Sequence, residues 1–264
     1  MKNRIKIIFF DIDGTLVDTR KKYISPKMVE ALNRLKRSKI LICIATGRAP
    51  MELPQFDGVV FDAFLTYNGS LCYDQEQIIF RNPLSEDDVH TIIRNATALH
   101  RPLSLATKSR LAANGKDADL VEYFGFAKIS VEVADDFNEV AQDEVYQIML
   151  GCREQDHPQL MQGVHNAKVT SWWDRAVDII PSNGGKGIGI EKVLEHYHLD
   201  KSEAMAFGDG NNDIEMLQTV GTGVAMANAS DKLKKSADDI CGDVRDDGIY
   251  DYLLAHHLIE SEGD

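Results

Sequence analysis

IIFFDIDGTLV, residues 7–17, is the stretch that decides the fold. Its first four residues are apolar, which is typical of a strand buried on both faces of a parallel sheet. Asp11 and Asp13 follow directly, and Gly14 allows the backbone to turn sharply after them. Because ligands of open parallel sheets bind beyond the carboxyl ends of the strands, we expect both carboxylates to lie in one small site there.

Strands and helices alternate on both sides of the chain's middle part. Ser25-Pro26 is typical of a helix start, and Met28, Leu32 and Leu35 form one apolar stripe after it. The other predicted elements are strands at 40–45, 59–65, 204–207 and 222–225 and helices at 188–196, 211–218, 230–236 and 247–256. This order predicts an α/β protein with a doubly wound, Rossmann-like parallel sheet.

The middle of the chain has a different pattern. A hairpin is expected around residues 74–76, followed by a helix that starts at Ser85 and by strands at 103–106, 146–150 and 167–172, with a short helix at 156–163. We therefore predict a catalytic core from residues 1–82 and 181–264 and an inserted α+β cap domain at 83–180.

Charge and composition exclude several classes of partner. The 264 residues include 42 acids and 29 Lys+Arg, a formal net charge of −13, which disfavours nucleic acids and anionic membranes but allows a small anionic substrate. The four cysteines are far apart in the sequence, as expected for reduced thiols. We find no signal peptide and no apolar run long enough to span a membrane, so a cytoplasmic protein is expected. The oligomeric state is not readable.

A second acidic motif, Gly208-Asp209-Gly210-Asn211-Asn212-Asp213, follows the predicted strand at 204–207. Such a turn is also a normal helix cap, and the spacing does not fit an EF-hand. The two acidic motifs together supply four carboxylates, those of Asp11, Asp13, Asp209 and Asp213. If these converge at the strand ends they would repel one another, so a divalent cation is expected there. Oxygen ligands alone favour Mg²⁺.

Two weaker motifs supply groups that bind anions. Thr46-Gly47-Arg48 ends a buried strand with a hydroxyl and backbone N–H groups, and Gly184-Gly185-Lys186-Gly187 brings one cation to a helix start. The lysine loop does not fit a Walker A motif, and no G-x-G-x-x-G follows the first strand, so nucleotide-binding motifs of both kinds are excluded.

Together, in this order, the four motifs resemble those of the haloacid dehalogenase superfamily of phosphotransferases, and the resemblance covers the whole chain. The insert between Thr46 and Lys186 looks like the α/β (type IIB) cap of Cof-type sugar-phosphatase-like members. Asn68-Gly69 after the third strand and Asp247-Gly248-Ile249 near the C-terminus match that group as well.

The resemblance implies a Mg²⁺-dependent phosphatase that acts on small phosphorylated metabolites through an aspartyl-phosphate. In this family the first aspartate is the nucleophile and the second the acid/base, so the catalytic residues would be Asp11 and Asp13. Mg²⁺ would bind Asp11, Asp209 and the backbone carbonyl of Asp13. The implied phosphate-binding residues are Ile12, Thr46, Gly47, Lys186 and Asn212, and Asp213 would orient Lys186 or a metal-bound water.

Two alternatives stay open. A phosphate sensor without activity would keep the pocket, although it need not keep the acid/base. A phosphoryl transferase or mutase of the same superfamily usually carries a helical cap at an earlier insertion point; here about 30 residues, filled by one helix and one strand, separate Asp13 from Thr46, which favours hydrolysis.

Overall fold

The computed structural model describes residues 5–21, 23–126, 129–171 and 174–260. Trp172 and Trp173, at the end of a strand predicted at 167–172, lie outside these ranges. The described residues form two compact units, one from those within 1–46, 54–80 and 186–264 and the other from those within 47–53 and 81–185. Each unit is described by itself below.

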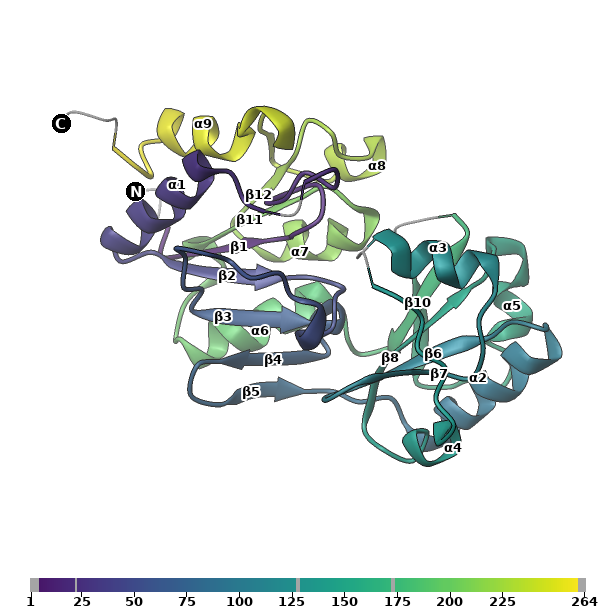
Figure 1. The fold of residues 1–264 in the computed structure, drawn as a ribbon. Helices are drawn as coiled ribbons and strands as arrows, with labels where there is room; N and C mark the ends of the chain where they lie inside the picture. Colours follow the sequence, from purple (N-terminus) through teal and green to yellow (C-terminus); the bar gives the residue numbers. More distant parts are fainter. Residues whose placement is uncertain (1–4, 22, 127–128, 172–173, 261–264) are drawn as a thin grey trace. The chain divides into compact units, whose positions relative to one another are not determined.

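The first unit contains an eight-stranded sheet with helices against it (Figure 1). Its strands, in spatial order, are β13 (Asp239–Ile240), β12 (Thr222–Ala225), β11 (Ala204–Gly208), β1 (Ile7–Phe10), β2 (Leu41–Ala45), β3 (Ala63–Thr66), β4 (Leu71–Asp74) and β5 (Ile78–Arg81). From β13 to β3 all neighbours are parallel, and β4 pairs antiparallel with β3. The predicted doubly wound sheet is therefore confirmed, and the predicted hairpin extends its edge.

Helices pack around the sheet and bury apolar residues. They are α1 (Pro26–Arg37), α6 (Lys186–His196), α7 (Ile214–Thr219), α8 (Asp231–Lys234) and α9 (Gly248–Ala255). The hydroxyl of Ser25 accepts the Met28 N–H and caps α1, as its sequence predicts. Helix α1 packs on β2 and α9, whereas α6 packs on α7, β3 and β4. Figure 1 shows α6 behind β3 and β4, away from α1 and α9.

The sheet order reverses between β1 and β11. From β1 the chain continues to β2 and then β3, whereas β11 continues to β12 and β13 on the other side. All four β1 residues are fully buried, because neighbours flank both edges and helices cover both faces. At such a switch point the two outgoing connections diverge and leave a crevice at the carboxyl ends of the strands. The two acidic motifs follow β1 and β11 at these carboxyl ends.

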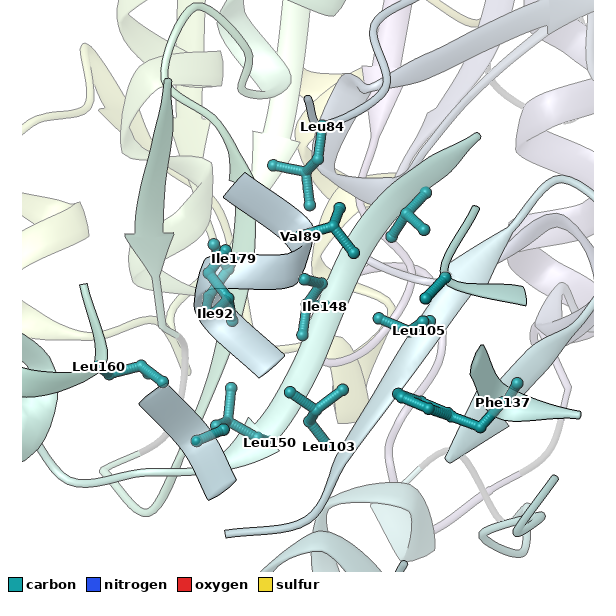
Figure 2. Packing of buried hydrophobic residues seen from close by; sticks show 14 of the residues in the cluster. Leu84, Val89, Ile92, Leu103, Leu105, Phe137, Ile148, Leu150, Leu160 and Ile179 are labelled. Atoms are coloured by element: carbon teal, nitrogen blue, oxygen red, sulfur yellow. The ribbon is translucent and has the colours of Figure 1, made fainter. Parts of the chain in front are cut away.

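The second unit has a five-stranded sheet in the order β7 (Leu111–Ala113), β6 (Leu103–Thr107), β8 (Val145–Gly151), β10 (Ala176–Pro181), β9 (Ala167–Thr170). Its helices are α2 (Glu86–Ala98), α3 (Ala118–Phe126), α4 (Phe137–Val140) and α5 (His157–Leu160). Figure 2 shows Val89 and Ile92 of α2 pointing onto strand residues such as Ile148. The unit thus has a hydrophobic core of its own.

Candidate active site

Asp11 and Asp209 lie side by side at the switch point. Phe10, the last residue of β1, is in register with Phe207 of β11, and the Asp11 N–H donates to the Phe207 carbonyl at 3.1 Å. Asp11 is 7% exposed. The parallel pairing of two buried strands therefore brings together acidic motifs that are almost 200 residues apart in the chain.

Three carboxylates converge at this edge. Asp11, Asp209 and Asp213 each offer one oxygen, and these oxygens all lie within 4.8 Å of one another. Gly14 makes room for the cluster: its φ is +85°, and a Cβ there would lie 2.2 Å from Asp209 Oδ2. Glycine is required at this position for both reasons.

Lys186, the first residue of α6, reaches into the cluster. Its Nζ lies 2.8 Å from Asp11 Oδ1 and 2.5 Å from Asp213 Oδ1, and the residue is 1% exposed. Burial by itself would lower the pKa of Lys186, but the charges of Asp11 and Asp213 outweigh it and raise this pKa. The lysine is therefore a permanent buried cation.

The Asp213 side chain links the first residue of α6 to the backbone that follows β11. One of its oxygens accepts from Lys186, and the other accepts the N–H groups of Asp209 and Gly210, both at 3.0 Å. The side chain is fully buried. These contacts account for both of its oxygens, which leaves Asp11 and Asp209 as the better candidates to contact a metal.

The cluster has more negative charge than Lys186 can balance. Burial raises the pKa of Asp11 to about 7 despite Lys186, with Asp213 and Asp13 adding to the increase. Burial, Asp11 and Asp213 together raise the pKa of Asp209 to about 8. A cation would relieve this repulsion, and a donor set made of oxygen atoms alone fits Mg²⁺.

Without metal, the raised pKa values predict that stability falls with rising pH. Between about pH 4 and pH 8 the folded protein keeps protons on Asp11 and Asp209 that the unfolded chain has lost, so this contribution to folding is present at low pH and lost as pH rises through 7 to 8. We expect Asp209→Asn to be more stable than the metal-free wild type, by a margin that grows over this range in thermal melts.

Mg²⁺ should reduce this difference at pH 8. At free Mg²⁺ a hundredfold above its Kd, the wild type should gain about 2.7 kcal/mol, or roughly 5–10 °C in Tm, and Asp209→Asn much less. A wild-type Tm that does not respond to Mg²⁺, or an equal response in the variant, would contradict the metal site.

The other predicted residues lie on neighbouring loops. Asp13 is half-buried in the tight turn after β1, where the Ile12 carbonyl accepts the N–H groups of Thr15 and Val17. Thr46 follows β2 and is almost fully buried. Gly47 starts the segment 47–53 that groups with the second unit.

Asn212 lies near the cluster, as do Asn68 and Asn228, two asparagines to which the sequence analysis gave no role. Asn212 lies in the turn after β11, and its Nδ2 donates to Asn68 Oδ1 at 3.1 Å. Asn228 Nδ2 donates to the Gly14 carbonyl at 2.8 Å. The Asn68-Gly69 pair, one residue beyond the end of β3, was the sequence pattern that could have indicated Asn68. For Asn228 no local pattern indicates its partner.

The four cysteines are free and buried. In the described part of the chain, no helix is both long and apolar enough to cross a membrane.

The first unit is thus a Rossmann-like sheet with an aspartate–lysine cluster at its switch point. The chain belongs to the haloacid dehalogenase-like hydrolases, whose family model matches residues 8–253. Within that family it is a Cof-type phosphatase, and its structural neighbours include phosphatases of subclass IIB. The predicted family and enzyme class are confirmed.

Individual relatives match over nearly their whole length. YkrA of Bacillus subtilis strain 168 is 32% identical over 246 residues, which are 92% of this chain and 95% of YkrA. YitU of the same strain is named as a 5-amino-6-(5-phospho-D-ribitylamino)uracil phosphatase. It is 27% identical over 96% of this chain and 98% of the YitU chain. The solved structure of the subclass IIB sugar phosphatase BT4131 has a TM-score of 0.88 and 26% identity, covering 96% of this chain and all of that one.

Proposed function

We propose that the protein is a cytoplasmic, Mg²⁺-dependent phosphatase that hydrolyses small phosphorylated metabolites, sugar phosphates among them, through an aspartyl-phosphate. The observation that carries this proposal is the cluster of Asp11, Asp209 and Asp213 around the buried Lys186 ammonium. YitU and BT4131 are named for a phosphorylated metabolite and for sugar phosphates respectively, which supports this class of substrate.

Asp11 is the proposed nucleophile. Its carboxylate oxygen attacks phosphorus in line, a bond forms between Asp11 and phosphorus, and the bond to the substrate's bridging oxygen breaks. Lys186 Nζ, held against Asp11 Oδ1 and Asp213 Oδ1, keeps a positive charge beside the reacting carboxylate. Ile12, Thr46, Gly47 and Asn212 are the proposed phosphate-binding residues, through backbone N–H groups, the threonine hydroxyl and the amide.

Asp13 is the proposed acid and base. As a carboxylic acid it gives its proton to the leaving oxygen, which departs as an alcohol. The resulting carboxylate takes a proton from water, whose oxygen attacks the phosphorus of the aspartyl-phosphate. Inorganic phosphate leaves, the Asp11 carboxylate is regenerated and Asp13 is again protonated.

Asp11, Asp209 and the backbone carbonyl of Asp13 are the proposed ligands of Mg²⁺. When bound, the cation offsets the repulsion between the nucleophilic carboxylate and the phosphate dianion. The oxygen-only donor set and the raised pKa values of Asp11 and Asp209 support this assignment.

Release of inorganic phosphate from p-nitrophenyl phosphate and a panel of metabolites tests the proposal. We expect turnover with Mg²⁺ and none with excess chelator. A wild-type protein that turns over none of these substrates, with Mg²⁺ present, would disprove the proposed activity.

Asp13→Asn tests the acid/base assignment. We expect turnover to fall about 10²–10⁴-fold and phosphorylated enzyme to accumulate with p-nitrophenyl phosphate, because p-nitrophenolate leaves without a proton whereas water still needs a base. Intact-protein mass spectrometry after rapid quenching should show the added phosphoryl group. Unchanged turnover, or a larger loss with p-nitrophenyl phosphate than with an alkyl phosphate, would refute the role.

A further inference from the structure

A buried segment with unusual backbone geometry follows β3. Tyr67, Asn68 and Gly69 all have positive φ, at 52°, 52° and 88°, and both non-glycine residues are at most 1% exposed. Residues other than glycine rarely adopt this left-handed backbone region. Three consecutive residues with positive φ persist only where the surrounding structure requires them.

Close packing against α6 restricts the segment on one side. Gly189 of α6 lies so close that a Cβ on it would be 3.0 Å from the Gly69 Cα. The segment therefore has little freedom to move away from the sheet, and the direction of the Asn68 side chain is set by the backbone.

Asn68 uses this position to connect two loops of the candidate active site. Its backbone N–H donates to the Thr46 carbonyl at 2.9 Å, which fixes the peptide that carries the Gly47 N–H. Its side-chain Oδ1 accepts from Asn212 Nδ2 at 3.1 Å, across 144 residues of sequence. One residue thus contacts both the loop after β2 and the loop after β11.

The contact with Asn212 also determines which way that amide faces. A primary amide carries two N–H donors on one side and an acceptor oxygen on the other. With one N–H held by Asn68 Oδ1, the second N–H has a fixed direction. The Asn212 oxygen lies against Gly210, where a Cβ would be 2.5 Å away. An amide turned the other way would present its oxygen where a phosphate needs a donor.

We propose that Asn68 is a positioning residue for phosphate binding: it orients the Asn212 amide and, through its backbone, the Thr46–Gly47 peptide. This rests on the proposed function, in which Thr46, Gly47 and Asn212 bind the phosphoryl group. Asparagine suits the position because it tolerates positive φ and also carries an acceptor oxygen. Glycine has the first property alone, and alanine has neither.

A double-mutant cycle between Asn68→Gly and Asn212→Ala tests the proposal. Asn68→Gly keeps the backbone N–H and the favourable φ, and it removes the oxygen that holds Asn212. We expect KM for p-nitrophenyl phosphate and Ki for inorganic phosphate to rise about 3–10-fold, the effect of one neutral hydrogen bond, with kcat changed less than about threefold. In the Asn212→Ala background the same change should alter Ki less than about twofold, because its partner is already gone.

Asn68→Asp is the second variant if the glycine protein does not fold: it tolerates positive φ and keeps an acceptor oxygen for Asn212 Nδ2, so its Ki for inorganic phosphate should stay below that of Asn212→Ala. The Mg²⁺-induced rise in Tm should remain in every variant, since none of them is a proposed metal ligand. Asn68→Gly with wild-type Ki, or with an equal loss in both backgrounds, would overturn the proposal. A wild-type enzyme without phosphatase activity would instead overturn the proposed function.

Discussion

Asp11→Asn is expected to lower kcat by at least about 10⁴-fold, which is a typical effect of removing a catalytic nucleophile. The amide has nearly the shape of the carboxylate but no charge with which to attack phosphorus. Because Lys186 keeps its contact with Asp213, the variant should fold. Steady-state kinetics with p-nitrophenyl phosphate, together with a search for the phosphorylated enzyme by mass spectrometry, measures the effect.

Asp62→Asn is the matched control. Asp62 Oδ1 contacts Lys36 Nζ at 2.8 Å, as Asp11 Oδ1 contacts Lys186, but its other oxygen accepts from Ile42 N–H, near the amino end of β2. We expect kcat of this variant within about twofold of the wild type, as for a paired carboxylate outside the site. If Asp11→Asn kept more than a few per cent of wild-type kcat, Asp11 would not be the nucleophile.

Lys186→Met is expected to destabilise the protein by about 3–5 kcal/mol, because breaking a buried ion pair leaves uncompensated charge. Two buried carboxylates, Asp11 and Asp213, would lose their shared cation. Without the Lys186 charge the pKa of Asp11 should rise further, so the loss should be largest at high pH. Urea unfolding at pH 6 and pH 8, both in chelator, measures it.

Lys36→Met is the control for that experiment. Lys36 pairs with one carboxylate, Asp62, and both side chains are partly exposed, so its loss should cost less than about 1 kcal/mol. Comparable costs for the two variants would contradict the view of Lys186 as the cation that holds the cluster. Activity adds a second readout, since Lys186→Met should also lose most phosphatase turnover whereas Lys36→Met should not.

Much of the fold follows from local patterns in the sequence. Buried strands such as β1 are continuous apolar runs, and the α1 start is marked by Ser25-Pro26. Helix α3 was missed because its residues, ADLVEYFGF, include a glycine and three aromatic residues, which are weak helix formers. The strand predicted at 59–65 begins only at Ala63. Strand β13 has two exposed residues and no pattern to read.

The candidate site was predictable where its residues end strands. Asp11, Thr46 and Asp209 each follow a buried strand, and the parallel sheet brings such ends to one edge. The contacts between them were not predictable, because they depend on side-chain directions across long sequence separations. That Asp213 holds both Lys186 and the Asp209 N–H, and that Asn68 meets Asn212, are results of tertiary packing.

The central place of β1 has a consequence for biosynthesis. One of its neighbours, β2, emerges from the ribosome soon after it, but the other, β11, is made almost 200 residues later, which takes roughly 10–40 s at common rates of elongation. During that interval β1 has one unpaired edge, a surface prone to aggregation. Residues 81–185, which hold their own hydrophobic core, can fold meanwhile. The sheet of the first unit can therefore be completed around β1 only after its last strands have been made.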